Sequence, residues 1–255
     1  MFINNRKLIR IYELRSLAKM FPKRSRVLEI GAGTGLQAKL LTNWGHDVKA
    51  IDISNGVNSK NALFPIEVYD GKNLCFTDES FDVVYSSCVL EHVEDLKALL
   101  SETKRVQKTE GCSIHILPTS VWRFWTSVTH YAVMPRRVAE FYSKWRNPGL
   151  QGDDRAGPIK KKITLRRFWN FLHPVKHGTK GNFITELYHF SEHRWQRQFL
   201  ATGFTVKQFE KIGIFYTGHC FFGRHLTLDW RRKLSPILGS SAMMFLLEKR
   251  NSKHK

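Results

Sequence analysis

The stretch Val27-Leu28-Glu29-Ile30-Gly31-Ala32-Gly33-Thr34-Gly35-Leu36 decides how the rest of the chain is interpreted. An apolar run leads into a turn with three glycines at alternate positions, and an amphipathic segment follows. This order predicts a strand over 26–30, a tight turn, and a helix over 35–44. The free amide groups and the positive dipole end of that helix would face a ligand bound at the turn.

Strand and helix patterns alternate on both sides of this stretch. Short connections between them predict right-handed βαβ units and a parallel sheet. A helix over 93–108 is expected to end near Gly111, which would cap it. The remaining elements expected are helices over 3–20 and 191–201 and strands over 47–51, 66–69, 81–86, 113–117, 204–210 and 243–249.

Acidic side chains follow the strands at the edge where open α/β sheets bind ligands. Asp52 stands about twenty residues after the glycines, where a carboxylate can accept hydrogen bonds from a ribose diol. Asp70 ends the next strand, where an adenine amino group would arrive. The glycines are spaced G-x-G-x-G rather than G-x-G-x-x-G, and Glu29 precedes them. An acid at that position would repel a pyrophosphate and suits a ligand that carries an ammonium group.

Residues 24–118 together resemble the class I S-adenosylmethionine-dependent methyltransferases of the type 11 group. The resemblance implies an α/β, Rossmann-like sheet of seven mostly parallel strands in the order 3-2-1-4-5-7-6. Helices would cover both faces, and an insertion would follow strand five. Cys75, Thr77 and Thr109-Glu110 depart from the pattern at positions that touch no cofactor. The residues that carry the resemblance are the stretches 27–35, 51–53, 70–71, 74–84, 89–93 and 105–111.

The same resemblance implies roles for individual residues toward S-adenosylmethionine. Glu29 would lie near the methionine ammonium group, and Asp52 would hold the ribose hydroxyls. Asp70 would bind the adenine amino group, and Ser87 and Cys88 would line the methionine end. The complete set implied for the cofactor is Glu29, Gly31, Ala32, Gly33, Gly35, Asp52, Ile53, Asp70, Gly71, Ser87 and Cys88.

His92 is the candidate catalytic base, because it follows strand four near the expected cofactor. A structural histidine packed on its loop is an equally good interpretation, and Glu91 is a weaker candidate. His130, His177 and His189 are alternatives that the insertion would have to bring into the pocket. No metal site is predicted: the four cysteines form no C-x-x-C pair and are interpreted as reduced thiols.

Positive charge is concentrated in the second half of the chain. Residues 1–118 carry 16 Lys and Arg against 14 Asp and Glu, whereas residues 119–255 carry 25 against 8. Such a field attracts anions, although each basic run taken singly is as readily a solvated face. We divide one methyltransferase domain, 1–255, into an N-terminal helix (1–23), a cofactor-binding core (24–118), a basic aromatic insertion or lid (119–190) and a C-terminal part of the sheet (191–255).

The aromatic segment 121–134 has three interpretations. It can be a lid over the acceptor pocket, a helix in a membrane interface, or core beneath the insertion. The N-terminus has no signal-peptide pattern, and the longest uncharged run, 234–247, is too short to cross a bilayer. We therefore expect a cytoplasmic protein, with association at the inner face of the membrane as the alternative.

These observations predict an enzyme that methylates oxygen on a small-molecule or lipid-linked, anionic acceptor. An RNA methyltransferase that uses the basic C-terminal half is one alternative. A methyltransferase fold that binds a partner without catalysis is the other, and the full set of cofactor residues argues against it.

Overall fold

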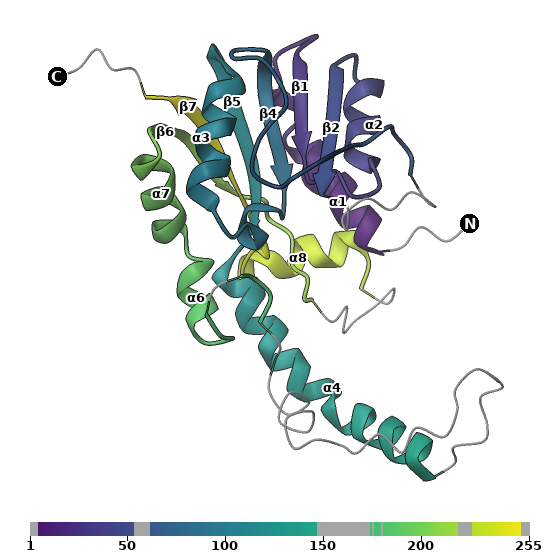
Figure 1. Ribbon diagram of the computed structural model, residues 1–255. Helices are drawn as coiled ribbons and strands as arrows, with labels where there is room; N and C mark the ends of the chain where they lie inside the picture. Colours follow the sequence, from purple (N-terminus) through teal and green to yellow (C-terminus); the bar gives the residue numbers. More distant parts are fainter. Residues whose placement is uncertain are drawn as a thin grey trace, which may run out of the picture.

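A computed structural model describes residues 5–53, 62–146, 174, 176–179, 181–218 and 226–250. Seven strands form a single sheet in the order β3-β2-β1-β4-β5-β7-β6, which confirms the expected topology (Figure 1). The strands are β1 (Arg26–Ile30), β2 (Asp47–Ile53), β3 (Glu67–Tyr69), β4 (Phe81–Ser87), β5 (Gln107–Pro118), β6 (Phe204–Lys211) and β7 (Ala242–Lys249).

Strand β7 is antiparallel to both of its neighbours, β5 and β6. The pairs β1–β2, β1–β4, β2–β3 and β4–β5 are all parallel. The carboxyl ends of β1 to β5 therefore meet at one edge of the sheet, which is the edge where ligands bind in this class of fold.

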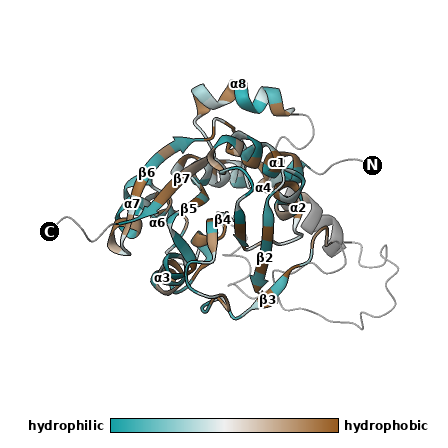
Figure 2. Ribbon diagram, turned by 90° about the horizontal axis from the view of Figure 1, so that it is seen from above, coloured by the Kyte–Doolittle hydropathy of each residue, from teal (hydrophilic) through white to brown (hydrophobic). Residues whose placement is uncertain are grey.

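Helices cover both faces of the sheet, as expected. Figure 2 shows α1 and α2 on one side of the row of strands and α3 on the other. Because side chains alternate along a strand, Val27 packs with the α1 and α2 side chains and Leu28 with those of α3 and α7. The helices are α1 (Asn5–Ser16), α2 (Leu36–Asn43), α3 (Leu96–Val106), α4 (Ser120–Arg146), α6 (Thr185–His189), α7 (Glu192–Ala201) and α8 (Leu228–Leu238), with short 3₁₀ turns at Ala18–Met20 and Leu90–His92.

The expected Gly111 helix cap was wrong. Helix α3 ends at Val106, and Gln107 already has an extended backbone that starts β5. Gly111 lies inside β5, and the Gln107 side chain donates a 2.8 Å hydrogen bond to its carbonyl. The apolar positions of this helix end at Val106, so the expected end at residue 108 ran two residues past them.

The helix expected over 121–134 is longer in the structure, and it contains Pro135. Trp122 and Thr126 are buried, whereas Phe124, Val128 and Tyr131 are exposed. One face of α4 is thus core, and the other is open to solvent or to a partner. The expected loop 147–157 and the basic runs 160–162 and 166–167 lie outside the described residues. Among the helices that the structure describes, none is long and apolar enough to span a bilayer.

Candidate functional site

The glycine turn joins β1 to α2 through three residues with positive φ, at 76°, 59° and 71° for Gly31, Gly33 and Gly35. An added Cβ would lie 2.2 Å from Val89 at the first position and 2.6 Å from Phe64 at the third. At Gly33 it would meet nothing within 4 Å. The first and third glycines are thus required by packing, and the middle one leaves open space above the turn.

Asp52, at the end of β2, is held against this turn. Its Oδ2 accepts a 2.7 Å hydrogen bond from the Gly33 amide, and its Oδ1 accepts one of 2.7 Å from the Ile53 amide. Each carboxylate oxygen retains a lone pair for a further donor. Ile53 is 45% exposed and packs close to Gly71, where an added Cβ would lie 3.3 Å from the Ile53 side chain. A carboxylate and an apolar surface therefore stand side by side at this strand end.

Asp70 is exposed and organises its own turn. Its Oδ1 accepts hydrogen bonds from the amides of Lys72 and Asn73, at 2.8 and 2.7 Å, and its Oδ2 accepts one from the Asn73 side chain at 2.7 Å. These bonds, first those from the Asn73 and Lys72 amides, lower the pKa of Asp70. The adenine amino group, if it binds here as expected, must donate to the lone pair of Oδ2 that accepts no other hydrogen bond.

Glu29 is buried beneath the turn, with 2% of its surface exposed. Its Oε2 has no hydrogen-bond partner among the described residues. Burial raises the pKa of Glu29 to about 8, against a smaller opposing effect of the Ala38 amide. A cationic group above the turn would supply the missing partner and would favour the ionised carboxylate. The site therefore fits a ligand with an ammonium group.

Arg10 of α1 is a site residue that the sequence analysis missed. Its Nη1 lies 3.0 Å from Cys88 Sγ and 3.5 Å from Ser87 Oγ, at the carboxyl end of β4. The same nitrogen donates a 2.6 Å hydrogen bond to Glu13, which also accepts one of 2.8 Å from the Tyr216 hydroxyl. The N-terminal helix is thereby joined to the end of β4. The basic residues of this helix are visible in the sequence, but Arg10 and Cys88 are 78 positions apart, so their contact is not.

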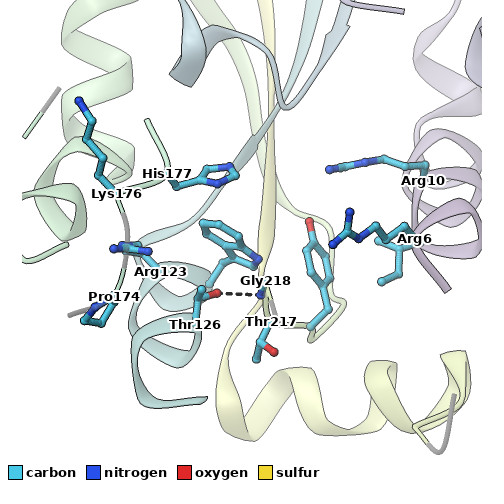
Figure 3. A pocket seen from close by; sticks show the side chains of 12 residues that line it. Arg6, Arg10, Arg123, Thr126, Pro174, Lys176, His177, Thr217 and Gly218 are labelled. Carbon is cyan, nitrogen blue, oxygen red and sulfur yellow. Dashed lines mark hydrogen bonds between the residues drawn. The ribbon is translucent and has the colours of Figure 1, made fainter. Parts of the chain in front are cut away.

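A pocket of about 420 Å³ opens beside Arg10, among α1, α4 and the segment after β6. Arg6 and Arg10 reach toward it from one side, and His177 and Arg123 stand on the other (Figure 3). None of the described residues that line it is acidic. Its volume is that of a small-molecule site. The remaining lining residues are Ile9, Trp122, Thr126, Pro174, Lys176, Tyr216, Thr217 and Gly218.

Glu91, His92 and His177, which the sequence analysis treated as separate candidates, form one cluster. Glu91 Oε1 lies 3.9 Å from Nε2 of His92 and 4.0 Å from Nε2 of His177. Burial raises the pKa of Glu91 to about 7, lowers that of His92, and lowers that of His177 to about 4. His189 borders a separate small cavity with Glu91, and the buried His130 lines neither of these two cavities.

The methyltransferase domain family matches residues 28–114, the part of the chain that holds the turn, Asp52 and the cluster residue Glu91. The chain carries a methyltransferase domain. This match confirms the resemblance stated above over residues 28–114, and S-adenosylmethionine is the cofactor that the resemblance implies. The open space at Gly33 and the unpartnered oxygen of Glu29 fit that cofactor.

Curated relatives match over the same region. The methyltransferase domain is 38% identical over 88 residues to demethylmenaquinone methyltransferase of Corynebacterium efficiens, covering 34% of this chain and 38% of that protein. It is 31% identical over 104 residues to sarcosine/dimethylglycine N-methyltransferase of Aphanothece halophytica, covering 36% and 38%. The chain thus matches little more than a third of the length of these relatives.

Solved structures match over nearly the whole chain. A methyltransferase of Mesorhizobium loti superposes with a TM-score of 0.55 at 16% identity, covering 93% of this chain and 98% of that one. One of Aquifex aeolicus gives 0.51 at 14% identity, covering 97% and 98%. These similarities show that the strands and helices beyond the methyltransferase motifs also follow the fold.

Proposed function

We propose that the protein transfers a methyl group from S-adenosylmethionine to an oxygen of a small-molecule or lipid-linked acceptor that carries negative charge. The observation behind the proposal is the basic pocket of about 420 Å³. Arg10 lines this pocket and also contacts Ser87 and Cys88. The pocket therefore adjoins the strand end where the methionine part of the cofactor is expected.

The cofactor supplies, when bound, a methyl group on a sulfonium that a nucleophile can displace. Asp52 would accept hydrogen bonds from the ribose hydroxyls, and the exposed Ile53 would pack on adenine. Asp70 and Gly71 would hold the far side of the adenine. The backbone of Gly31 to Gly35 and the Glu29 carboxylate would hold the amino-acid part.

The acceptor side is proposed from charge and from the relatives. Arg6 and Arg10 would hold an anionic group, since hydrogen bonds to ionised groups are the stronger ones. The two relatives reported above are named for small-molecule acceptors, and this supports a small molecule over RNA. Methyl transfer depends mainly on the alignment of the reacting atoms, so the walls of the pocket contribute by positioning.

His92 stays the proposed residue for the acceptor proton, either directly or as part of the cluster with Glu91 and His177. Its imidazole is neutral near pH 7 because burial lowers its pKa. An oxygen nucleophile gains reactivity when such a group receives its proton.

Transfer of labelled methyl from the cofactor into fractionated cell extract tests the proposal. We expect label in the small-molecule or lipid fraction. Less label is expected with Asp52→Ala, whose affinity for the cofactor should fall at least about tenfold with the loss of charged hydrogen bonds. Label in RNA, together with a salt-dependent gel shift, would instead establish the RNA alternative suggested by the basic second half. Absence of cofactor binding at millimolar concentration in calorimetry would remove the enzyme and leave a binding protein.

A further inference from the structure

We propose that Glu91, His92 and His177 bind one divalent transition-metal ion, with Zn²⁺ as the reference ion, at the edge of the basic pocket. The proposal goes beyond methyl transfer and holds whatever the acceptor is. It also departs from the sequence analysis, which predicted no metal site because it looked for cysteine pairs. His92 and His177 are 85 positions apart in the chain, so no local sequence motif predicts the cluster.

The separations within the cluster suit a shared ion better than hydrogen bonds. The distances of 3.9 and 4.0 Å from Glu91 Oε1 to the two imidazole nitrogens exceed the range of a hydrogen bond. Two ligands that each lie about 2.0–2.2 Å from one zinc ion are about 3.3–4.2 Å apart. One ligand atom of each residue lies within 4.8 Å of the other two. A common ion therefore fits with small side-chain rotations.

Glu91 presents the second, independent observation. Its side chain is fully buried, and neither carboxylate oxygen has a hydrogen-bond partner among the described residues. A buried carboxylate without a partner is costly, and a cation removes that cost. The charge of the nearby Arg10 favours the ionised form of Glu91, but its guanidinium is hydrogen-bonded to Glu13 at 2.6 Å and makes no hydrogen bond to Glu91 among the described residues.

Hydrogen bonds to Glu186 and to the Glu91 carbonyl hold the backbone around His177 in place. The amides of His177 and Gly178 both donate to Glu186 Oε1, at 2.7 and 2.6 Å, and the Thr179 amide donates to the Glu91 carbonyl at 3.2 Å. Glu186 is in turn paired with Arg123 at 2.8 Å, in full burial. These hydrogen bonds fix the backbone around His177 beside Glu91.

Three protein ligands leave a fourth position open, as in catalytic zinc sites. His177 lines the basic pocket, so that position would face the acceptor. A hydroxyl bound to the ion would have a lowered pKa and would release its proton to solvent before the oxygen is methylated. His92 would then act as a ligand in place of a free base. Two imidazoles and one carboxylate select transition metals over Mg²⁺, which prefers oxygen ligands.

Calorimetric titration of the metal-free, full-length protein with ZnCl₂, after removal of any affinity tag, tests the proposal. We expect one Zn²⁺ ion to bind per protein molecule. Co²⁺ bound in its place should give the visible absorption band of a four-coordinate site. Glu91→Gln and His177→Ala should each weaken binding by more than about tenfold, the smallest loss expected even for a supporting residue. His193→Ala, an exposed histidine of α7 outside the cluster, is the matched control and should bind as the wild type does.

Thermal unfolding of each variant shows whether it is folded, and His92→Ala replaces any variant that is not. Absence of zinc binding by the folded wild type overturns the proposal, as does equal binding by Glu91→Gln. The second outcome would point to a water molecule in the adjoining cavity of about 30 Å³ as the partner of Glu91. A parallel titration with S-adenosylmethionine keeps a failure of the metal site distinct from a failure of the methyltransferase function.

Discussion

Glu29 should release a proton when the cofactor binds near pH 7. Its pKa of about 8 in the free protein means that the buried carboxyl is mostly protonated there, and a cofactor ammonium group favours the ionised form. Calorimetry in buffers of different ionisation enthalpy measures this release. In Glu29→Gln the release should disappear, and an unchanged release would contradict the assignment of Glu29 to the ammonium group.

The raised pKa of Glu29 also predicts how the stability of the folded protein changes with pH. Because its pKa is raised from an ordinary value of 4.5, the folded state favours the protonated form. The stability that Glu29 contributes is fully present below pH 4.5 and is lost as the pH rises to about 8. Over this window, wild-type protein without cofactor should lose free energy of unfolding relative to Glu29→Gln in urea titrations. Parallel curves for the two proteins would show that Glu29 ionises freely in the folded state.

At the scale of residues, the sequence predicted positions better than partners. The glycines, Asp52 and Asp70 stand at strand ends because residue order alone places them there. Asp52 accepts a hydrogen bond from the Gly33 amide, and Glu91 lies beside His177. Both contacts depend on side-chain directions and join residues that are far apart in the sequence. Local pattern does not encode either, and Arg10 was missed for the same reason.

At the scale of elements, Gly33→Ala should reduce cofactor binding far more than it reduces stability. An alanine there meets nothing in the free protein but projects into the open space above the turn. Gly45→Ala is the matched control, since Gly45 also has a positive φ and open surroundings, at the far end of α2. Both variants should lose about 1–2 kcal/mol of unfolding free energy. Equal cofactor affinity in the two, measured by calorimetry, would place the ligand away from the turn.

The contact between α4 and α6 depends on the buried pair of Arg123 and Glu186. Glu186→Gln removes the charge that faces Arg123 and should cost about 3–5 kcal/mol, the range for breaking a buried ion pair. Glu210→Gln, on the exposed strand β6, is the control and should change little. Urea unfolding compares them. A loss below about 1 kcal/mol in Glu186→Gln would mean that the pair contributes no more than a surface one.

Elements bounded by clear glycine and polar signals were predicted closely, and elements without them were not. The boundaries of β1 match the prediction, because a short apolar run meets glycine on one side and polar residues on the other. Helix α8 was missed: it contains Pro236 and exposes Trp230 and Ile237, so it lacks a clean apolar face. Helix α6 spans five residues, too few to show a helical period.

At the scale of the whole molecule, the basic pocket should control the acceptor and not the cofactor. Arg6→Gln should raise the KM for the acceptor by at least about tenfold, as expected for the loss of a charged hydrogen bond. Arg15→Gln, on the same helix but outside the pocket, should leave it unchanged. Cofactor affinity should be the same in both variants. An equal KM in both would show that Arg6 does not touch the acceptor.

The order of the strands could be expected from the alternation of elements together with the resemblance to a known family. The pocket could not, because its walls come from α1, α4 and the segment 212–218. Only the complete sheet, with β7 inserted between β5 and β6, brings these segments together.

The hydrogen bond between Tyr216 and Glu13, which joins residues 203 positions apart, has a consequence for biosynthesis. A growing chain acquires β1 to β5, and with them the glycine turn and Asp52, once residue 118 has been made. The proposed acceptor pocket lacks the wall that contains Tyr216 until this residue has left the ribosome and has reached α1. A nascent chain can therefore complete the sheet edge that binds the methyl donor well before the proposed acceptor pocket has formed.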